Sequence, residues 1–373
     1  MEREKARKFI APAFSTQNLA LTIPFLFDSM DWAHDILSNH AVSGEKIELK
    51  GFLLTLLLKT LSKSSLGIEF SEKPDAPGTI DGKAYLFEEH IAIKERFSQA
   101  VKAWRRFMFW DKDVRRGNEA CQHMTRVGEH VLSSARRSLQ EARTAHYNGL
   151  VIGRLLEHAY PSEKARIADL LILIIAGHET SASTMLFFLL ELVRHPEVLA
   201  KVHAELDATF ELDAFAKRTV TLQQVSEASL PYTNACLKES QRLWPVAAAG
   251  SGRTMQEDYF CPELDMLIPK DSVVIFPFYI INRQAWIDRP NEYIPERWLS
   301  GAPQEPQLRE MLMPFSLGKR NCIGQNMANM QLKFLAAFFL RQFSFELVSE
   351  PEVFDNNLTF CPRNLTVTVK QRA

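Results

Sequence analysis

The chain has 373 residues, of which 46% are hydrophobic and 24% are charged, and its formal net charge is -1. This composition provides ample apolar material for a large globular core. The near-zero net charge argues against a nucleic-acid-binding protein, because such a protein needs a basic surface to neutralise phosphates.

The cysteines and the N-terminus limit the class of protein further. Five cysteines are spaced irregularly, at positions 121, 236, 261, 322 and 361, which indicates neither a disulfide framework nor a zinc site and favours a reducing compartment. The charged N-terminus does not resemble a signal sequence. The strongest apolar runs, at 53–58 and 170–176, are shorter than the roughly 20 residues that span a bilayer. The sequence as given therefore predicts no membrane anchor.

The first two thirds of the chain read mostly as helix. The apolar pattern predicts helices over 49–63, over 113–145 with a break near Gly117, and from Ser162 to Arg194. The third of these is apolar all round in its middle, which is typical of a helix at the centre of a large helical protein. Pro196 ends it, because a proline disfavours the helical conformation of the residue before it.

After Leu230 the elements become shorter. The pattern predicts a helix over 231–243, strands over 252–254, 266–268 and 273–276, an irregular stretch over 283–312, a helix over 323–343, and strands over 345–348 and 365–369. The predicted fold class is therefore mostly α, with small β-sheets toward the C-terminus.

A lone cysteine, Cys322, lies between two glycines at the start of the last predicted helix. Gly318 permits a turn, and Gly324 allows the backbone to approach a flat partner closely. Unpaired N–H groups and the helix dipole favour an anion at this position, which predicts a lowered thiol pKa. A thiolate can be a nucleophile or a metal ligand. The apolar neighbours Phe315 and Ile323 favour the ligand, and a buried structural cysteine is the alternative.

The pattern Phe315-x-x-Gly318-x-Arg320-x-Cys322-x-Gly324 resembles the haem-binding loop of the cytochrome P-450 family at every position. The resemblance implies a helical prism around haem b, with the Cys322 thiolate as the ligand to the iron. It also implies that the other four residues of the pattern shape the cofactor site, with Arg320 pairing with a haem carboxylate.

The segment Ala176–Ser181 of the long helix resembles the oxygen-activation motif of the same family. Small side chains at Ala176 and Gly177 leave space, and Thr180 can donate a hydrogen bond to the carbonyl four residues earlier and open the helix locally. The resulting groove would hold O2 and water beside Thr180 and Glu179. The alternative is ordinary packing of small residues against another helix.

Two further segments fit the family in the expected order. Glu239 and Arg242 lie three apart on one helix face and can pair, and the segment Pro295–Trp298 resembles the one that adds Arg297 to that pair. The implied triad is structural; the alternative is a weak surface pair. The resemblance also assigns Arg253 to a haem propionate.

The front of the chain departs from the family pattern. The segment 4–14 resembles the third helix of the family, and Arg7 lies where that helix contributes an arginine to a propionate. The resemblance therefore implies one monooxygenase domain over residues 1–373 that is N-terminally truncated, without the family's membrane anchor, first strands and earlier helices.

The resemblance implies a monooxygenase that inserts one atom of O2 into a small hydrophobic substrate, with electrons from NADPH through NADPH-cytochrome reductase. Glu179 and Thr180 would deliver protons, and Val246, Ala248, Leu358 and Phe360 are candidate substrate contacts. The sequence style suggests the eukaryotic microsomal type. A full-length protein of this type would lie at the cytosolic face of the endoplasmic reticulum, and the chain as given would be cytoplasmic. Two alternatives remain open: an inactive fragment, and an isomerase or dehydratase that needs no O2. The Glu179–Thr180 pair argues against the second alternative.

Overall fold

A long central helix, α8 (Glu163–Arg194), organises the fold of the computed structural model, which describes residues 2–71, 79–142, 150–351, 355–356 and 359–372. The Ser162 hydroxyl caps the start of α8 by accepting a hydrogen bond from the N–H of Ala165. On length and composition α8 could also cross a membrane, but 56% of its most apolar window is buried inside the protein.

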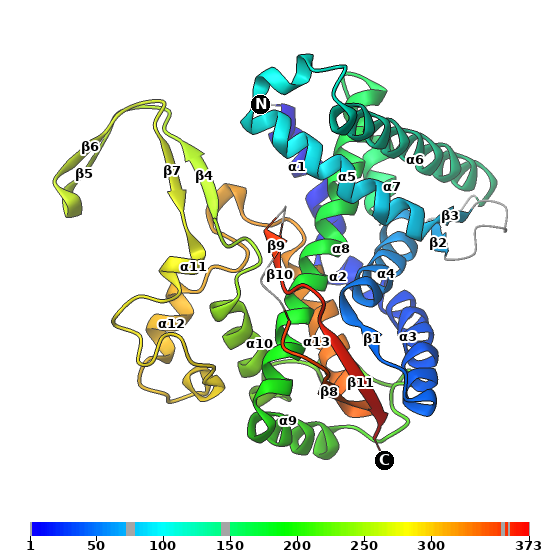
Figure 1. Cartoon of the computed structure of the whole chain (residues 1–373), viewed down its shortest axis with the longest axis vertical. Coiled ribbons are helices and arrows are strands. Elements are labelled where there is room, and N and C mark those ends of the chain that lie inside the picture. The colour runs from blue at the N-terminus through cyan, green and yellow to red at the C-terminus, as the bar shows by residue number, and fades with distance from the viewer. Residues whose placement is uncertain (1, 72–78, 143–149, 352–354, 357–358, 373) are drawn as a thin grey trace.

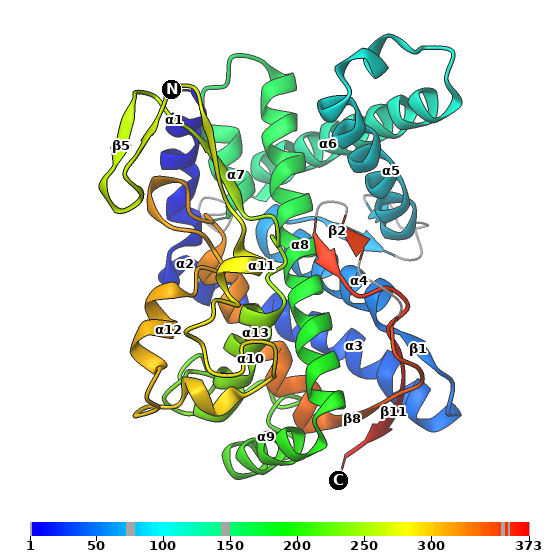
Figure 2. The same ribbon diagram turned by 60° about the vertical axis from the view of Figure 1, so that its left-hand side comes forward.

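The other helices surround α8. In both views α3 and α4 lie on one side of α8, and α10 and α12 lie on the other (Figure 1, Figure 2). Their bounds are α1 (Glu2–Ile10), α2 (Thr16–Ala20), α3 (Ile23–Ser43), α4 (Leu49–Leu61), α5 (Gly82–Val101), α6 (Lys112–Ala142), α7 (Val151–Glu157), α9 (Pro196–Thr209), α10 (Pro231–Leu243), α11 (Phe278–Ile281), α12 (Glu305–Met311) and α13 (Gln325–Gln342).

The strands of the described residues form small sheets. A three-stranded antiparallel sheet joins β1 (Ile47–Glu48), β11 (Thr366–Gln371) and β8 (Phe343–Leu347), with Val367 opposite both Ile47 and Leu347. The remaining strands form pairs: β2 (Glu69–Ser71) with β3 (Thr79–Asp81), β4 (Ser251–Thr254) with β7 (Val273–Phe276), β5 (Tyr259–Cys261) with β6 (Met266–Ile268), and β9 (Asp355–Asn356) with β10 (Phe360–Cys361).

The β4–β7 ribbon and the β5–β6 hairpin extend away from the helical body (Figure 1). Large apolar side chains are exposed along this arm, among them Leu264, Val273 and Ile275. The helical body is packed differently: one continuous cluster of buried apolar side chains includes residues of α3, α4, α8 and α13. The Phe334 ring of α13, for example, meets Phe27 of α3 edge to face at 6.0 Å. The site is therefore built on rigid helices beside a thin ribbon.

The predicted elements match the structure closely, and the mostly α fold class is confirmed. Two predictions were wrong. The stretch 283–312, predicted to be irregular, contains α12, and α6 is continuous through Gly117. Gly117 is buried, and a Cβ at this position would lie 2.3 Å from the Cβ of Glu95 in α5. The glycine therefore allows α5 and α6 to pack closely, and it does not break the helix.

Candidate functional site

A cavity of about 340 Å³ lies between α8, the loop 313–324, the start of α13 and the segment 244–250. Its volume is in the range of small-molecule and cofactor sites. Most of the lining is apolar, and hydroxyl groups of α8 and the thiol of Cys322 contribute polar atoms. Eight residues predicted from the sequence line it: Ala176, Gly177, Thr180, Val246, Phe315, Arg320, Cys322 and Gly324.

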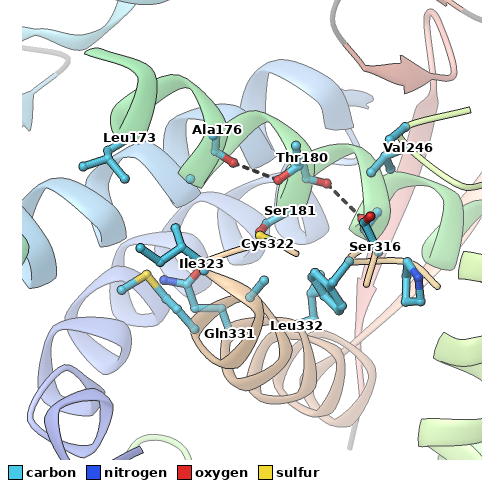
Figure 3. A pocket seen from close by; sticks show the side chains of 18 of the residues that line it. Leu173, Ala176, Thr180, Ser181, Val246, Ser316, Cys322, Ile323, Gln331 and Leu332 are labelled. Atoms are coloured by element: carbon cyan, nitrogen blue, oxygen red, sulfur yellow. Dashed lines mark hydrogen bonds between the residues drawn. The ribbon is translucent and has the colours of Figure 1, made fainter. Parts of the chain in front are cut away.

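The loop that carries Cys322 is held by its own backbone. The N–H of Cys322 donates to the carbonyl of Phe315 at 2.8 Å, which closes the loop. Gly318 has φ +72°, a left-handed conformation that favours glycine, and no atom would contact a Cβ there within 4 Å. Gly324 forms the N-cap of α13. Cys322 lies below α8 with its sulfur in the cavity (Figure 3).

The net electrostatic effect at Cys322 differs from the sequence prediction. Cys322 is exposed as a residue, and its thiol lines the cavity and is partly buried by the surrounding protein. This partial burial raises the pKa of the thiol, although a hydrogen bond from the Gly324 N–H and the charge of Arg7 act in the opposite direction. The helix start alone therefore does not hold a thiolate here. A metal ion can do so, because coordination deprotonates a thiol.

The α8 wall of the cavity contains the predicted hydroxyl. Thr180 Oγ1 donates to the carbonyl oxygen of Ala176 at 2.8 Å, and Thr184 Oγ1 donates to that of Thr180 at 2.9 Å (Figure 3). The helix nevertheless stays continuous. At Gly177 a Cβ would lie 2.8 Å from Cδ2 of Leu61 in α4, so the packing alternative accounts for this glycine.

The structure does not bring Glu179 and Thr180 together in the cavity. Glu179 lines a second, smaller pocket of about 50 Å³, together with Lys50, Glu89 and Thr359. Its Oε1 accepts a hydrogen bond from Thr359 Oγ1 at 2.9 Å. Burial raises the pKa of Glu179, and the hydrogen bond from Thr359 lowers it by less.

The three arginines predicted to meet the haem carboxylates occupy different places. Arg320 is exposed and lines the cavity. Arg253, on β4, donates to the Gly252 carbonyl and lies 3.5 Å from Ser316 Oγ of the cysteine loop. Arg7 donates to Asn321 Oδ1 at 2.7 Å. Arg7 and Arg253 are not among the described residues that line the cavity. Both contact the loop that carries Cys322.

Glu239, Arg242 and Arg297 form a buried network on the other side of α10. Arg242 donates from Nε and Nη2 to the two carboxylate oxygens of Glu239, each at 2.8 Å, and Arg297 Nε donates to Oε1 at 3.0 Å. The indole N–H of Trp298 donates to Oε2 at 2.8 Å. The network ties α10 to the segment around η6 (Pro295–Trp298), and its residues are not among those that line the cavity.

The predicted substrate contacts are divided. Val246 lines the cavity, whereas Ala248 and Phe360 are not among the described lining residues. The Ala248 carbonyl accepts the N–H of Tyr279, and Phe360 packs against Phe187, with ring centroids 5.5 Å apart. Leu358 lies outside the described residues.

Sequence reasoning missed several lining residues. Met327 and Gln331 lie four apart on α13, so they project from one face toward the cavity. Their helical spacing was the available signal. Trp244 also lines the cavity, and its indole N–H donates to Glu191 Oε1 at 2.9 Å. The sequence pattern did not distinguish it from a core aromatic residue.

Comparisons with known proteins agree with this arrangement. A family model described as Cytochrome P-450 matches residues 2–369. The cytochrome P-450 monooxygenase acrF of Aspergillus aculeatus is 25% identical, over 92% of this chain and 72% of its own length. The mitochondrial 25-hydroxyvitamin D-1 alpha hydroxylase of Rattus norvegicus is 30% identical, over 76% of this chain and 52% of its own length.

A comparison with solved structures also finds a cytochrome P-450 fold. The crystal structure of a cytochrome P-450, CYP102L1, matches with a TM-score of 0.83 over 99% of this chain and 81% of that chain, at 20% sequence identity. The family model spans nearly the whole sequence, from α1 to β11. The chain belongs to the cytochrome P-450 family.

Proposed function

We propose that this protein is a haem-thiolate monooxygenase that acts on a small hydrophobic substrate with electrons from NADPH, delivered by a reductase. One oxygen atom of O2 enters the substrate, and the other leaves as water after two electrons and two protons are taken up. The observation that carries the proposal is the sulfur of Cys322 in a mostly apolar cavity whose opposite wall carries Thr180.

The residues of the cavity fit a haem. Cys322 directs a soft sulfur ligand into the space, and soft ligands suit haem iron. Gly324 adds no side chain beside that sulfur: a Cβ there would lie 3.9 Å from it. Arg320 makes no hydrogen bond or ion pair to any other residue that the structure describes, and its exposed side chain lines the same cavity. Such a cation is suited to a carboxylate of the cofactor.

Bound haem would supply the activation of O2 and its insertion into the substrate, and the chain would supply binding, orientation and protons. Cys322 would hold the group through its sulfur, and Arg320 would neutralise one of its carboxylates. The apolar lining favours an apolar substrate and excludes bulk water. The Thr180 hydroxyl can carry a proton at Oγ1 if it gives up its hydrogen bond to the Ala176 carbonyl.

The comparisons support this class of reaction. Two relatives are named a monooxygenase and a hydroxylase, and both names describe oxygen insertion. An isomerase or dehydratase of the haem-thiolate type would consume neither O2 nor NADPH, so reductant consumption distinguishes the two functions. An inactive fragment would hold no haem.

The test is the spectrum of the haem-reconstituted, reduced chain under carbon monoxide. A thiolate-ligated haem gives a red-shifted Soret band, and we expect this band in the wild type and its loss in Cys322→Ser. Absence of the band in the wild type, or its persistence in the variant, would refute the proposed ligand.

A second variant tests Thr180. If its hydroxyl relays protons, Thr180→Ala will release more hydrogen peroxide per NADPH consumed, because the cavity loses the side chain that would deliver protons for water formation. Thr184→Ala is a matched control, because it removes a neighbouring hydroxyl that also bonds an α8 carbonyl. Equal peroxide yields in wild type and Thr180→Ala would exclude the relay.

A further inference from the structure

We propose that Glu191 is a positioning residue that holds Trp244 as a partition between the cavity and a polar groove, and that this partition limits the length of the substrate. The limit on the substrate rests on the proposed monooxygenase function. The bond between the two residues requires only the folded chain.

Trp244 borders two hollow spaces. It lines the cavity that contains the sulfur of Cys322, and it also lines a groove of about 590 Å³. The cavity lining is mostly apolar, whereas the groove is lined by charged side chains, among them Arg194, Glu197 and Lys201. Trp244 therefore separates an apolar space from a polar one.

One face of α8 serves both the cavity and Trp244. Helical residues are about 100° apart, so positions 180, 184, 187 and 191 lie within about 60° of one another around the axis. Thr180 and Thr184 line the cavity. The ring of Phe187 stacks on that of Trp244, with centroids 5.1 Å apart, and the indole N–H donates to Glu191 Oε1 at 2.9 Å. A single helix therefore fixes the position of the partition relative to the Thr180 hydroxyl.

Glu191 is itself held in place. It is only 4% exposed, and its Oε1 also accepts a hydrogen bond from Arg194 Nη1 at 3.2 Å. Its Oε2 lies 3.6 Å from Nδ1 of His195. A carboxylate accepts a stronger hydrogen bond than a neutral oxygen does, and burial limits the competition from water. Glu191 is therefore suited to anchor the indole of Trp244.

Trp244 begins the wall segment 244–250 of the cavity. Val246, two residues later, lines the cavity opposite α8 (Figure 3). The backbone of the segment is tied elsewhere: the Val246 carbonyl accepts the N–H of Phe360 at 2.9 Å, and the Ala248 carbonyl accepts that of Tyr279 at 3.2 Å. The indole bond ties the segment to α8, so a shift of the indole moves the wall at Val246.

The first test measures the bond itself, by ultraviolet resonance Raman spectra that report hydrogen bonding at an indole N–H. The chain has six tryptophans, so the Trp244 signal is the difference between each chain and the same chain with Trp244→Phe. We expect the hydrogen-bonded band in wild type, its loss in Glu191→Leu, and its retention in Glu191→Gln, whose amide oxygen also accepts. An unchanged band in Glu191→Leu would overturn the anchor.

The second test measures the length limit in the haem-reconstituted chain. N-methylimidazole and N-octylimidazole both bind haem iron through nitrogen, and the shift of the Soret band gives their dissociation constants. We expect Glu191→Leu to strengthen the binding of N-octylimidazole relative to N-methylimidazole by at least about tenfold, because the longer apolar chain gains buried contact when the wall moves. Glu191→Gln should keep the wild-type ratio.

Two further variants separate positioning from lost stability. Trp244→Phe and Glu191→Leu remove the same bond, so their effects on the affinity ratio should not add in the double variant. Val131→Ala removes buried methyl groups from α6 and should keep the wild-type ratio at lower stability. A wild-type ratio in Glu191→Leu, or an equal rise in Val131→Ala, would refute the positioning role. A wild type that takes up no haem would instead refute the monooxygenase function, and the Raman spectra would still test the anchor.

Discussion

The Glu239 network and the Cys322 loop differ in whether the protein supplies partners for their polar groups. The side chains of Glu239 and Arg242 are 0% exposed, and the protein itself supplies their partners: Arg242 also donates to the carbonyls of Asn282, Pro290 and Glu292. Cys322 faces a cavity, and the protein around it raises the pKa of its thiol.

This difference separates structural charge from functional charge. A buried ion pair whose hydrogen bonds are all made fixes two segments relative to each other, and it offers nothing to a ligand. A thiol whose pKa the protein raises, and a guanidinium without a partner among the described residues, can both be stabilised as charged groups when a ligand binds. The same family resemblance predicted both sites, and the hydrogen bonds distinguish the satisfied network from the open cavity.

The largest effect on folding is expected at the centre of the network. Glu239→Gln removes the negative charge between two buried arginines, so we expect it to lower the free energy of unfolding by about 3–5 kcal/mol. Urea unfolding measures this loss. Glu305→Gln removes a surface partner of Arg309 and should cost no more than about 1 kcal/mol. A loss at Glu239 as small as that at Glu305 would mean that the network is not structural.

A smaller loss is expected at the edge of the network. Arg297→Lys keeps the positive charge near Glu239 but loses the donors to the carbonyls of Asp288 and Arg289. Because these buried carbonyls are left without a donor, we expect the free energy of unfolding, measured in urea, to fall by about 1.5–3 kcal/mol. Arg297→Leu, which also removes the charge, should cost more. If both variants cost the same, charge contributes nothing at this position.

The Cys322 loop should behave differently in the same experiment. Without haem, Cys322→Ser is expected to change the free energy of unfolding by no more than about 0.5 kcal/mol, because the side chain faces a cavity. Cys236, which is buried in α10, is the control. Cys236→Ser places a more polar hydroxyl at a fully buried position and should cost about 1–3 kcal/mol. A comparable loss at Cys322 would show that the loop contributes to folding as well as to ligand binding.

The fold was largely predictable because its signals are local. Apolar periodicity set the limits of α4, α8, α10 and α13, and Pro196 marked the end of α8. The error at Gly117 arose because its reason is tertiary: the glycine makes room for Glu95, 22 positions earlier in the chain. No pattern within α6 contains that contact.

The sequence predicted several residues of the candidate site, but it predicted less well where their side chains point. The motifs identified Cys322, Thr180 and Arg320, which share one cavity. They did not reveal that Glu179 points into another pocket, because that depends on the helical offset from Thr180 and on a hydrogen bond from Thr359, 180 positions away. They also did not reveal that burial outweighs the helix start in setting the pKa of Cys322.

The smallest expected effect concerns a group that lies in neither region. His203 of α9 has a buried Nε2 without a hydrogen-bond partner among the described residues. Burial, with the nearby charge of Arg372, lowers its pKa from 6.5 to about 4, and Asp207 opposes this shift. Unlike the polar groups of the cavity, it is not among the residues that line any described pocket near the site.

The sign of the pH effect follows from this shift. Between pH 6.5 and about 4 the unfolded chain binds a proton at His203 and the folded chain does not, so stability falls as the pH is lowered through this range. We expect His203→Gln to reduce that fall, and His40→Gln, at the half-buried C-terminal end of α3, to leave it unchanged. Melting temperatures of the three chains between pH 7 and 4 measure the difference. A steeper fall of the melting temperature at low pH in His203→Gln than in wild type would mean that the charged form of the buried ring stabilises the fold, as the charges of the Glu239 network do. Burial alone would then not predict which polar groups the protein leaves unpaired.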